Sequence, residues 1–153
     1  MHRLTILTVI TILVTSASTY GADEALDDDI REIVFRYQFR EFAAGNTPKA
    51  RCISFSSQED PPASFLARFR NHSPPVLARS ECERRFPIGR DPLVEPYAAM
   101  FFFISNVGAL PDGRYSATGG YMGGRLEGAR GVFVLELQDR HWVVKEFRVH
   151  AIS

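Results

Sequence analysis

Between positions 30 and 42, apolar residues recur at intervals of three and four, which is the spacing of one face of a helix. They fall into two stripes, and two stripes predict a helix that other structure covers around much of its circumference. Asp27, Asp28 and Asp29 predict the start of this helix, because acidic residues favour a helix N-terminus, and the Gly-Asn-Thr-Pro run at 45–48 predicts its end. The first stripe is Ile30, Ile33, Val34 and Tyr37, and the second is Phe35, Phe39 and Phe42.

Strand patterns dominate the second half of the chain, where turn residues separate apolar segments. These segments predict a four-stranded antiparallel meander. The first half adds two short strands and a second helix, for which Asp60 is the expected cap. Helices early and strands late indicate an α+β fold, with N-terminal helices packed on a curved antiparallel sheet. The meander strands are expected at 98–107, 114–122, 125–137 and 141–152, and the short strands at 51–56 and 76–82.

The segment at 98–107 is apolar on both of its sides. In a regular strand Met100 and Phe102 point to one face of the sheet, and Phe101 and Phe103 point to the other. A sheet with one face in water does not show this pattern. The helices can cover one face. The second face is therefore expected to meet a partner chain, as in a homodimer through the sheet, or to wall a cavity for a small-molecule or protein ligand.

The first 21 residues have the pattern of a secretory signal peptide. A short positive start precedes an apolar run at 4–14, which is too short to span a bilayer, and small residues follow it. The rival interpretation is a buried N-terminal strand or helix. We expect a signal peptide at 1–21, a single α+β domain at 22–153, a periplasmic or secreted location, and no membrane attachment after cleavage.

Charge and motif content narrow the possible functions. The chain has 18 basic and 18 acidic side chains, a balance that argues against a nucleic-acid partner, because phosphate neutralisation needs a basic surplus. No phosphate-binding loop or nucleophile elbow is present in the sequence, and the histidines lack the spacing of metal ligands. We therefore expect neither a cofactor nor a metal.

Cys52 and Cys82 are the two cysteines of the chain, and in an oxidising compartment they predict one disulfide. If both lie on strands, they can sit on neighbouring edges. Two buried free thiols remain the rival interpretation, and a catalytic cysteine is a weaker third, because no activating histidine lies near either in the sequence.

Five motifs stand out in the chain: PPASFLARF at 61–69, SEC at 80–82, GGYMGG at 119–124, HWVVK at 141–145 and HAIS at 150–153. Together they resemble a group of short exported bacterial proteins of unassigned function, over most of residues 29–153. More loosely, helices followed by a curved meander resemble the NTF2-like and cystatin-like folds. The resemblance implies a fold that hosts isomerases, dehydratases and non-catalytic binding modules, so it does not decide the activity.

The last segment carries the main candidate chemistry. Under strict alternation Glu146, Arg148 and His150 form a row on one face, together with Trp142. In a pocket, His150 could act as a general base that Glu146 orients, and Arg148 could hold an anionic substrate. On a solvent-facing strand the same row is an ordinary ladder of charges. Trp142 and Tyr121 complete the candidate binding residues.

We therefore expect an exported, non-catalytic binding or interaction domain. The alternative is a small-pocket NTF2-like enzyme that performs proton transfer with His150 and Glu146. A cystatin-like inhibitor, with contact loops at 108–113 and 138–141, is a third hypothesis.

Overall fold

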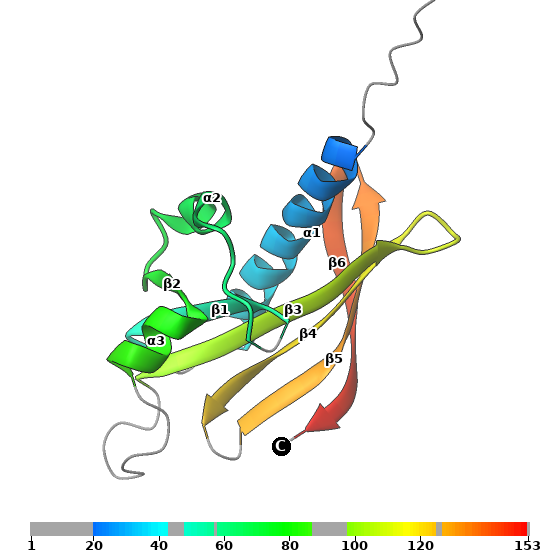
Figure 1. The fold of residues 1–153 in the computed structure, drawn as a ribbon. Helices are drawn as coiled ribbons and strands as arrows, with labels where there is room; N and C mark the ends of the chain where they lie inside the picture. Colours follow the sequence, from blue (N-terminus) through cyan, green and yellow to red (C-terminus); the bar gives the residue numbers. More distant parts are fainter. Residues whose placement is uncertain (1–19, 43–47, 57, 87–97, 125–126, 153) are drawn as a thin grey trace, which may run out of the picture.

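The computed structural model describes residues 20–42, 48–56, 58–86, 98–124 and 127–152. Within them a long helix comes first, short strands and short helical elements follow, and four long strands complete the chain (Figure 1). The α+β class predicted from the sequence is confirmed. The elements are α1 (Tyr20–Glu41), β1 (Ala50–Phe55), α2 (Ala63–Leu66), the 3-10 helix η1 (Ala67–Phe69), β2 (Val76–Ala78), α3 (Arg79–Arg85), β3 (Ala99–Ala109), β4 (Tyr115–Gly124), β5 (Glu127–Gln138) and β6 (His141–Ile152).

Six strands form one mixed sheet in the order β2-β1-β3-β4-β5-β6. Its second half is the predicted antiparallel meander, in which each strand pairs with the next one along the chain. Its first half corrects the prediction of an antiparallel sheet, because β1 runs parallel to both β2 and β3. Parallel neighbours need a crossover connection. The segment that contains α2 and η1 supplies this crossover between β1 and β2.

Helix α1 packs on one face of the sheet, which we call the inner face (Figure 1). Both of its apolar stripes reach the core, as predicted: Ile30 and Phe35 are fully buried. Elements α2 and η1 extend this cover, and the ring of Phe65 lies 6.1 Å from that of Phe35. The sheet contributes Met100, Phe102, Ile104, Phe133 and Leu135 to the same core.

The start of α1 differs from the prediction. The helix begins at Tyr20, so the acidic run at 27–29 lies inside it rather than at its N-terminus. There the acids form ion pairs: Arg68 Nη1 on η1 lies 2.7 Å from Asp29 Oδ1 and 3.0 Å from Glu32 Oε2. These pairs tie η1 to α1. The helix ends at Glu41, and most of the predicted stop signal lies outside the described residues.

The strand predicted at 76–82 is shorter than expected. Strand β2 ends at Ala78, and helix α3 follows at once. Cys82 therefore lies on a helix and not on a strand edge. Asp60 does not cap α2, since its carboxylate accepts hydrogen bonds from the backbone N–H and hydroxyl of Ser80 in the first turn of α3. A short polar side chain caps whichever helix end is near it, and here that end is distant in sequence.

The two hairpin turns between β4, β5 and β6 can be compared with their predicted positions. Strand β4 continues through Gly123 and Gly124, which the sequence predicts to be the turn, and Gly124 pairs with Glu127 across residues 125–126, which lie outside the described residues. Between β5 and β6 the turn is confirmed where it was predicted. Asp139 and Arg140 form it with φ angles of 47° and 67°. Positive φ at both central residues suits the twist of a two-residue hairpin.

Strand β6 departs from regular alternation. Its register against β5 shifts twice, between the partners of Val134 and Leu135 and between those of Arg130 and Gly131. Each shift inserts one residue of β6, Lys145 at the first and His150 at the second. An inserted residue reverses the faces of the positions that follow it. The prediction that Trp142 shares a face with Glu146 is therefore wrong.

Candidate functional site

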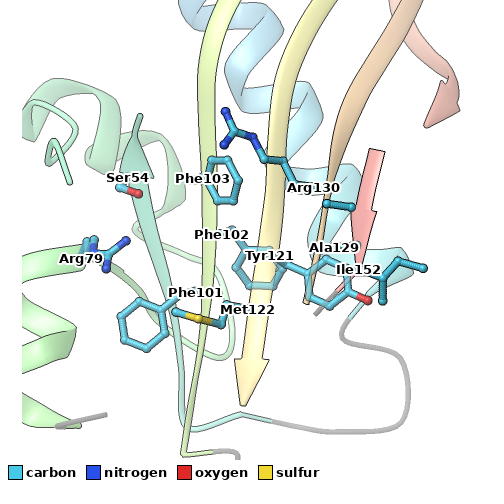
Figure 2. Close-up of a pocket in the computed structure, with 11 residues that line it drawn as sticks. Ser54, Arg79, Phe101, Phe102, Phe103, Tyr121, Met122, Ala129, Arg130 and Ile152 are labelled. Atoms are coloured by element: carbon cyan, nitrogen blue, oxygen red, sulfur yellow. The ribbon is translucent and has the colours of Figure 1, made fainter. Parts of the chain in front are cut away.

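The face of the sheet opposite α1, which we call the outer face, is only partly covered. Helix α3 packs over β1 and the start of β3, where Cys52, Cys82 and Phe101 are buried together. Beside this helix the outer face forms a hollow of about 270 Å³, which we call the outer hollow (Figure 2). Its described lining is Ser54, Arg79, Phe101, Phe102, Phe103, Tyr121, Met122, Ala129, Arg130, Ala151 and Ile152.

A glycine leaves the space for the outer hollow. The register of the meander places Gly120 on β4 between Phe103 on β3 and Arg130 on β5. A Cβ atom at Gly120 would lie 2.1 Å from the carbonyl oxygen of Ala129 and 3.0 Å from a ring carbon of Phe103. Only glycine allows strands to approach so closely. The side chains on either side of it become the walls of the hollow.

These walls are mainly apolar. Alternation along β3 turns Phe101 and Phe103 toward the outer face, and Met122 on β4 is the register partner of Phe101. Met122 is 36% exposed and Ile152, at the end of β6, is 82% exposed. The sequence pattern at 98–107 predicts that the second face of the sheet is apolar as well, and the structure confirms this for Phe101 and Phe103.

Two guanidinium groups give the outer hollow its charge. The guanidinium of Arg79 on α3 lies 5.8 Å from the ring centroid of Phe101, and that of Arg130 on β5 lies 5.9 Å from the ring centroid of Phe103. Arg79 Nε also donates to Glu83 Oε1 at 2.7 Å. Arg130 forms no ion pair with a carboxylate of the described residues. Each cation thus stands over an aromatic wall.

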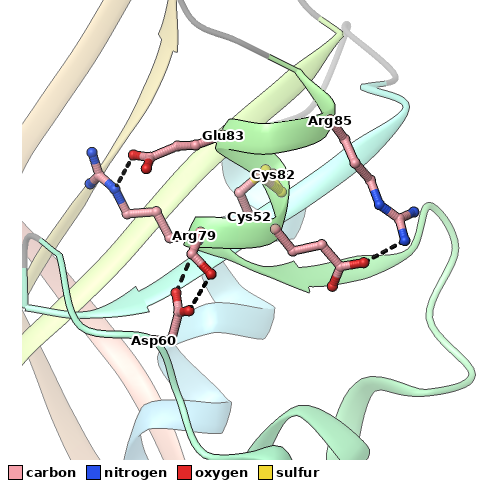
Figure 3. The surroundings of a disulfide bond; sticks show 8 residues. Cys52, Asp60, Arg79, Cys82, Glu83 and Arg85 are labelled. Carbon is pink, nitrogen blue, oxygen red and sulfur yellow. Dashed lines mark hydrogen bonds and ion pairs between the residues drawn. A yellow bond between two sulfur atoms is a disulfide. The ribbon is translucent and has the colours of Figure 1, made fainter.

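A disulfide holds α3 in place beside the hollow (Figure 3). It joins Cys52 on β1 to Cys82 on α3, with their Cα atoms 5.9 Å apart, so the predicted pairing is confirmed. Both cysteines are fully buried. Asp60 holds the first turn of the same helix through Ser80 (Figure 3). Together these contacts anchor the helix that carries Arg79.

None of the three residues of the predicted row on β6 is among the described lining of the outer hollow. Glu146 Oε2 accepts from Arg148 Nη2 at 2.8 Å, and both side chains are about half exposed. This bond from Arg148 is the main cause that holds the pKa of Glu146 below its ordinary value, and it raises the pKa of Arg148. His150 is exposed and lies at the second register shift. The described geometry of Glu146 and Arg148 is that of a solvent-facing charge ladder, and a catalytic role for His150 with Glu146 stays a prediction.

The rings of the two predicted aromatic residues both pack against the inner core, at different strands of the sheet. Trp142 faces the inner side of the sheet, where its ring lies 4.9 Å from that of Tyr115. Tyr121 stacks on Phe42 with the ring centroids 4.5 Å apart, and it also lines the outer hollow. Of the predicted binding residues Arg148, Trp142 and Tyr121, only Tyr121 is among the lining residues described.

His72 caps a turn just before β2. Its Nδ1 lies 2.9 Å from the carbonyl oxygen of Pro74 and its Nε2 lies 2.9 Å from Arg51 Nη1. A guanidinium can only donate, so Nε2 accepts and Nδ1 donates to the carbonyl. Burial lowers the pKa of Arg51, whose guanidinium also stacks on Phe39 at 4.9 Å. This arrangement joins β1 to the segment before β2.

Sequence reasoning missed both arginines of the outer hollow. Arg130 is the one charged residue between Glu127 and Glu136 in the segment at 125–137, and that exception is the signal that could have identified it. Arg79 offered no such signal, because its position depends on α3, which the pattern at 76–82 does not predict.

Comparison of the chain with family models, with curated proteins and with solved structures found no match.

Proposed function

We propose that this chain is an exported, non-catalytic binding domain whose ligand site is the outer hollow. The observation that carries the proposal is an apolar depression on the second face of the sheet, with Phe101 and Phe103 as walls and Arg79 and Arg130 above them. Concave, mainly apolar surfaces with a few polar groups are the usual form of small-molecule sites.

Export is the second part of the proposal. The Cys52–Cys82 disulfide supports it, because such bonds persist in oxidising compartments such as the periplasm or the extracellular space. The signal peptide predicted at 1–21 falls mainly on residues outside those described, so it rests on the sequence pattern. Among the residues that the structure describes, no helix combines the length and the apolar character that crossing a bilayer requires.

For the fold family we propose the NTF2-like or cystatin-like group. The support for this assignment is the long helix α1 packed on one face of a four-stranded meander. In such an arrangement the helix fills the inner face. The ligand site proposed here is on the opposite face of the sheet.

Native mass spectrometry of the full chain, exported in a bacterial host and purified without reductant, tests the proposal. We expect removal of about 21 residues, a mass two hydrogens below that of the reduced chain, and a bound small molecule on a monomer. A bare dimer would overturn the ligand site, because the outer face would then be an interface between two copies. Retention of the N-terminal residues after export would overturn the cleaved signal peptide.

A further inference from the structure

We infer that the outer hollow binds an amphipathic anion, that is, a short hydrocarbon chain that ends in a carboxylate or a phosphate. This inference rests on the proposed function and names its class of ligand. It combines two features of the same depression: apolar walls for a hydrocarbon body, and a guanidinium that pairs with no carboxylate of the described residues, for a negative head group.

Arg130 is the residue on which the inference depends. Strand alternation and register direct it to the outer face, opposite Gly120 on one side and Ala151 on the other. Its guanidinium stands 5.9 Å from the ring of Phe103, close to the limit of about 6 Å for contact between a cation and a ring face. An anion that enters the hollow therefore displaces no ion pair with a described carboxylate. A guanidinium fork binds carboxylate or phosphate oxygens in pairs.

Arg79 adds a second cation across the hollow (Figure 2). Its bond to Glu83 balances part of its charge and fixes its position on α3. None of the described lining residues is acidic. Arg79 and Arg130 therefore give the hollow a positive potential, which favours an anionic ligand over a neutral or cationic one.

The size of the outer hollow limits the ligand. Its volume of about 270 Å³ lies just below the range of roughly 300–1,000 Å³ that is usual for small-molecule sites. One short chain fits such a space. A second copy of this chain is less favoured, because a twofold interface over this face would place Arg79 and Arg130 on both of its sides.

Calorimetric titration of the oxidised full chain at low salt tests the inference with three probes: octanoate, octyl phosphate and octan-1-ol. We expect at least one of the two anions to bind about tenfold more tightly than the alcohol, because a charge-assisted pair with Arg130 forms only with an anion. Comparison of the two anions shows which head group the hollow prefers. Added salt should reduce the advantage of the anion.

Single-residue variants test which residue sets the preference for an anion and where the probes bind. Arg130→Gln should remove the roughly tenfold preference for the anion and leave the binding of octan-1-ol unchanged. Arg70→Gln is the matched control, since Arg70 is an exposed arginine at the end of η1 on the other side of the sheet. Ala151→Trp should fill the hollow and abolish the binding of every probe, whereas Ala109→Trp, at the far end of β3, should not.

The outcomes separate the two levels of the proposal. Equal binding of alcohol and anions, abolished by Ala151→Trp, would overturn the anionic ligand and keep the binding site. An unchanged preference in Arg130→Gln would overturn the role of Arg130. If no probe binds and the purified chain carries no molecule, the proposed function itself fails. Circular dichroism and an intact disulfide confirm that each variant is folded.

Discussion

Arg140 occupies a backbone conformation that suits glycine better. Its φ angle is 67° in the turn between β5 and β6, and a side chain in this left-handed region costs about 1–2 kcal/mol. We expect Arg140→Gly to raise the free energy of unfolding by about 0.5–1 kcal/mol, the net gain after the greater freedom of glycine in the unfolded chain. Urea titration measures the change. Arg140→Ala is the control, because it removes the charge and keeps the strain, and an equal gain in that variant would contradict the explanation.

Individual residues show why sequence reasoning located some contacts and missed others. The disulfide followed from composition, because the chain has two cysteines and one possible pairing. The position of Arg130 in the outer hollow depends on the register of β5 against β4, and no local sequence pattern contains that register. Local chemistry therefore predicts a residue well when its partner is unique, and poorly when the partner depends on how strands align.

At the level of elements, α1 contains an acidic residue whose environment opposes its charge. Burial raises the pKa of Asp27, and Asp23 and Asp28 add to the shift while Arg31 opposes it. An acid with a raised pKa in the folded state contributes stability below its ordinary value of 3.8, and that stability is lost as the pH rises through the folded pKa. We expect Asp27→Asn to stabilise the protein at pH 7 and to have no such effect near pH 3.

Thermal unfolding at both pH values measures the effect of Asp27→Asn. A gain in stability that is equal at both pH values would show that the charge of Asp27 is not its source.

Asp112 provides the opposite case, because hydrogen bonds from Arg114 lower its pKa. A lowered pKa contributes stability above the ordinary value, and the contribution is lost as the pH falls. Asp112→Asn should therefore destabilise the protein at pH 7 and have no such effect near pH 2.

Helix α3 depends on the disulfide that attaches it to β1. The bond closes a loop with a sequence separation of 30 residues, which limits the unfolded chain and is worth about 3–4 kcal/mol in the chain-entropy model. We expect the double variant Cys52→Ala, Cys82→Ala to lose roughly this amount in urea titration. Hydrogen exchange should rise most over α3. Equal stability of the double variant and the oxidised chain would mean that the unfolded chain is already restricted over this loop when the bond is absent.

The elements also show where sequence patterns reach their limit. The four meander strands were predicted to within about two residues, because each is long and bounded by turn residues. Residues 76–82 contain both a strand and a helix, and neither is long enough to show a period. In β6 the inserted Lys145 reverses the faces beyond it, so strict alternation placed Glu146 beside Trp142. Short elements and bulges are set by packing between strands, which a periodic pattern does not record.

For the whole molecule, the two apolar faces of the sheet are covered to different extents. The inner face is filled by α1, α2 and η1, and its aromatic rings lie in a continuous core. The outer face is covered by α3 over β1 and the start of β3, and the cover ends at the outer hollow. The sequence predicted that both faces are apolar. It did not predict that one short helix would divide the second face into a closed part and an open part.

We expect a ligand that binds in the open part of the outer face to stabilise the folded chain. A ligand that binds only the folded chain stabilises it by about 2.7 kcal/mol at a concentration one hundred times its Kd. For a chain of this length each kcal/mol raises the Tm by roughly 2–4 °C, so octanoate at that concentration should raise it by roughly 5–10 °C. Differential scanning calorimetry measures the shift. In Ala151→Trp, which fills the outer hollow, the Tm should not respond to octanoate, while Ala109→Trp should respond as the parent does. A shift that persists in Ala151→Trp would place the stabilising site elsewhere on the molecule, because linkage requires that the occupied space exist in the folded state.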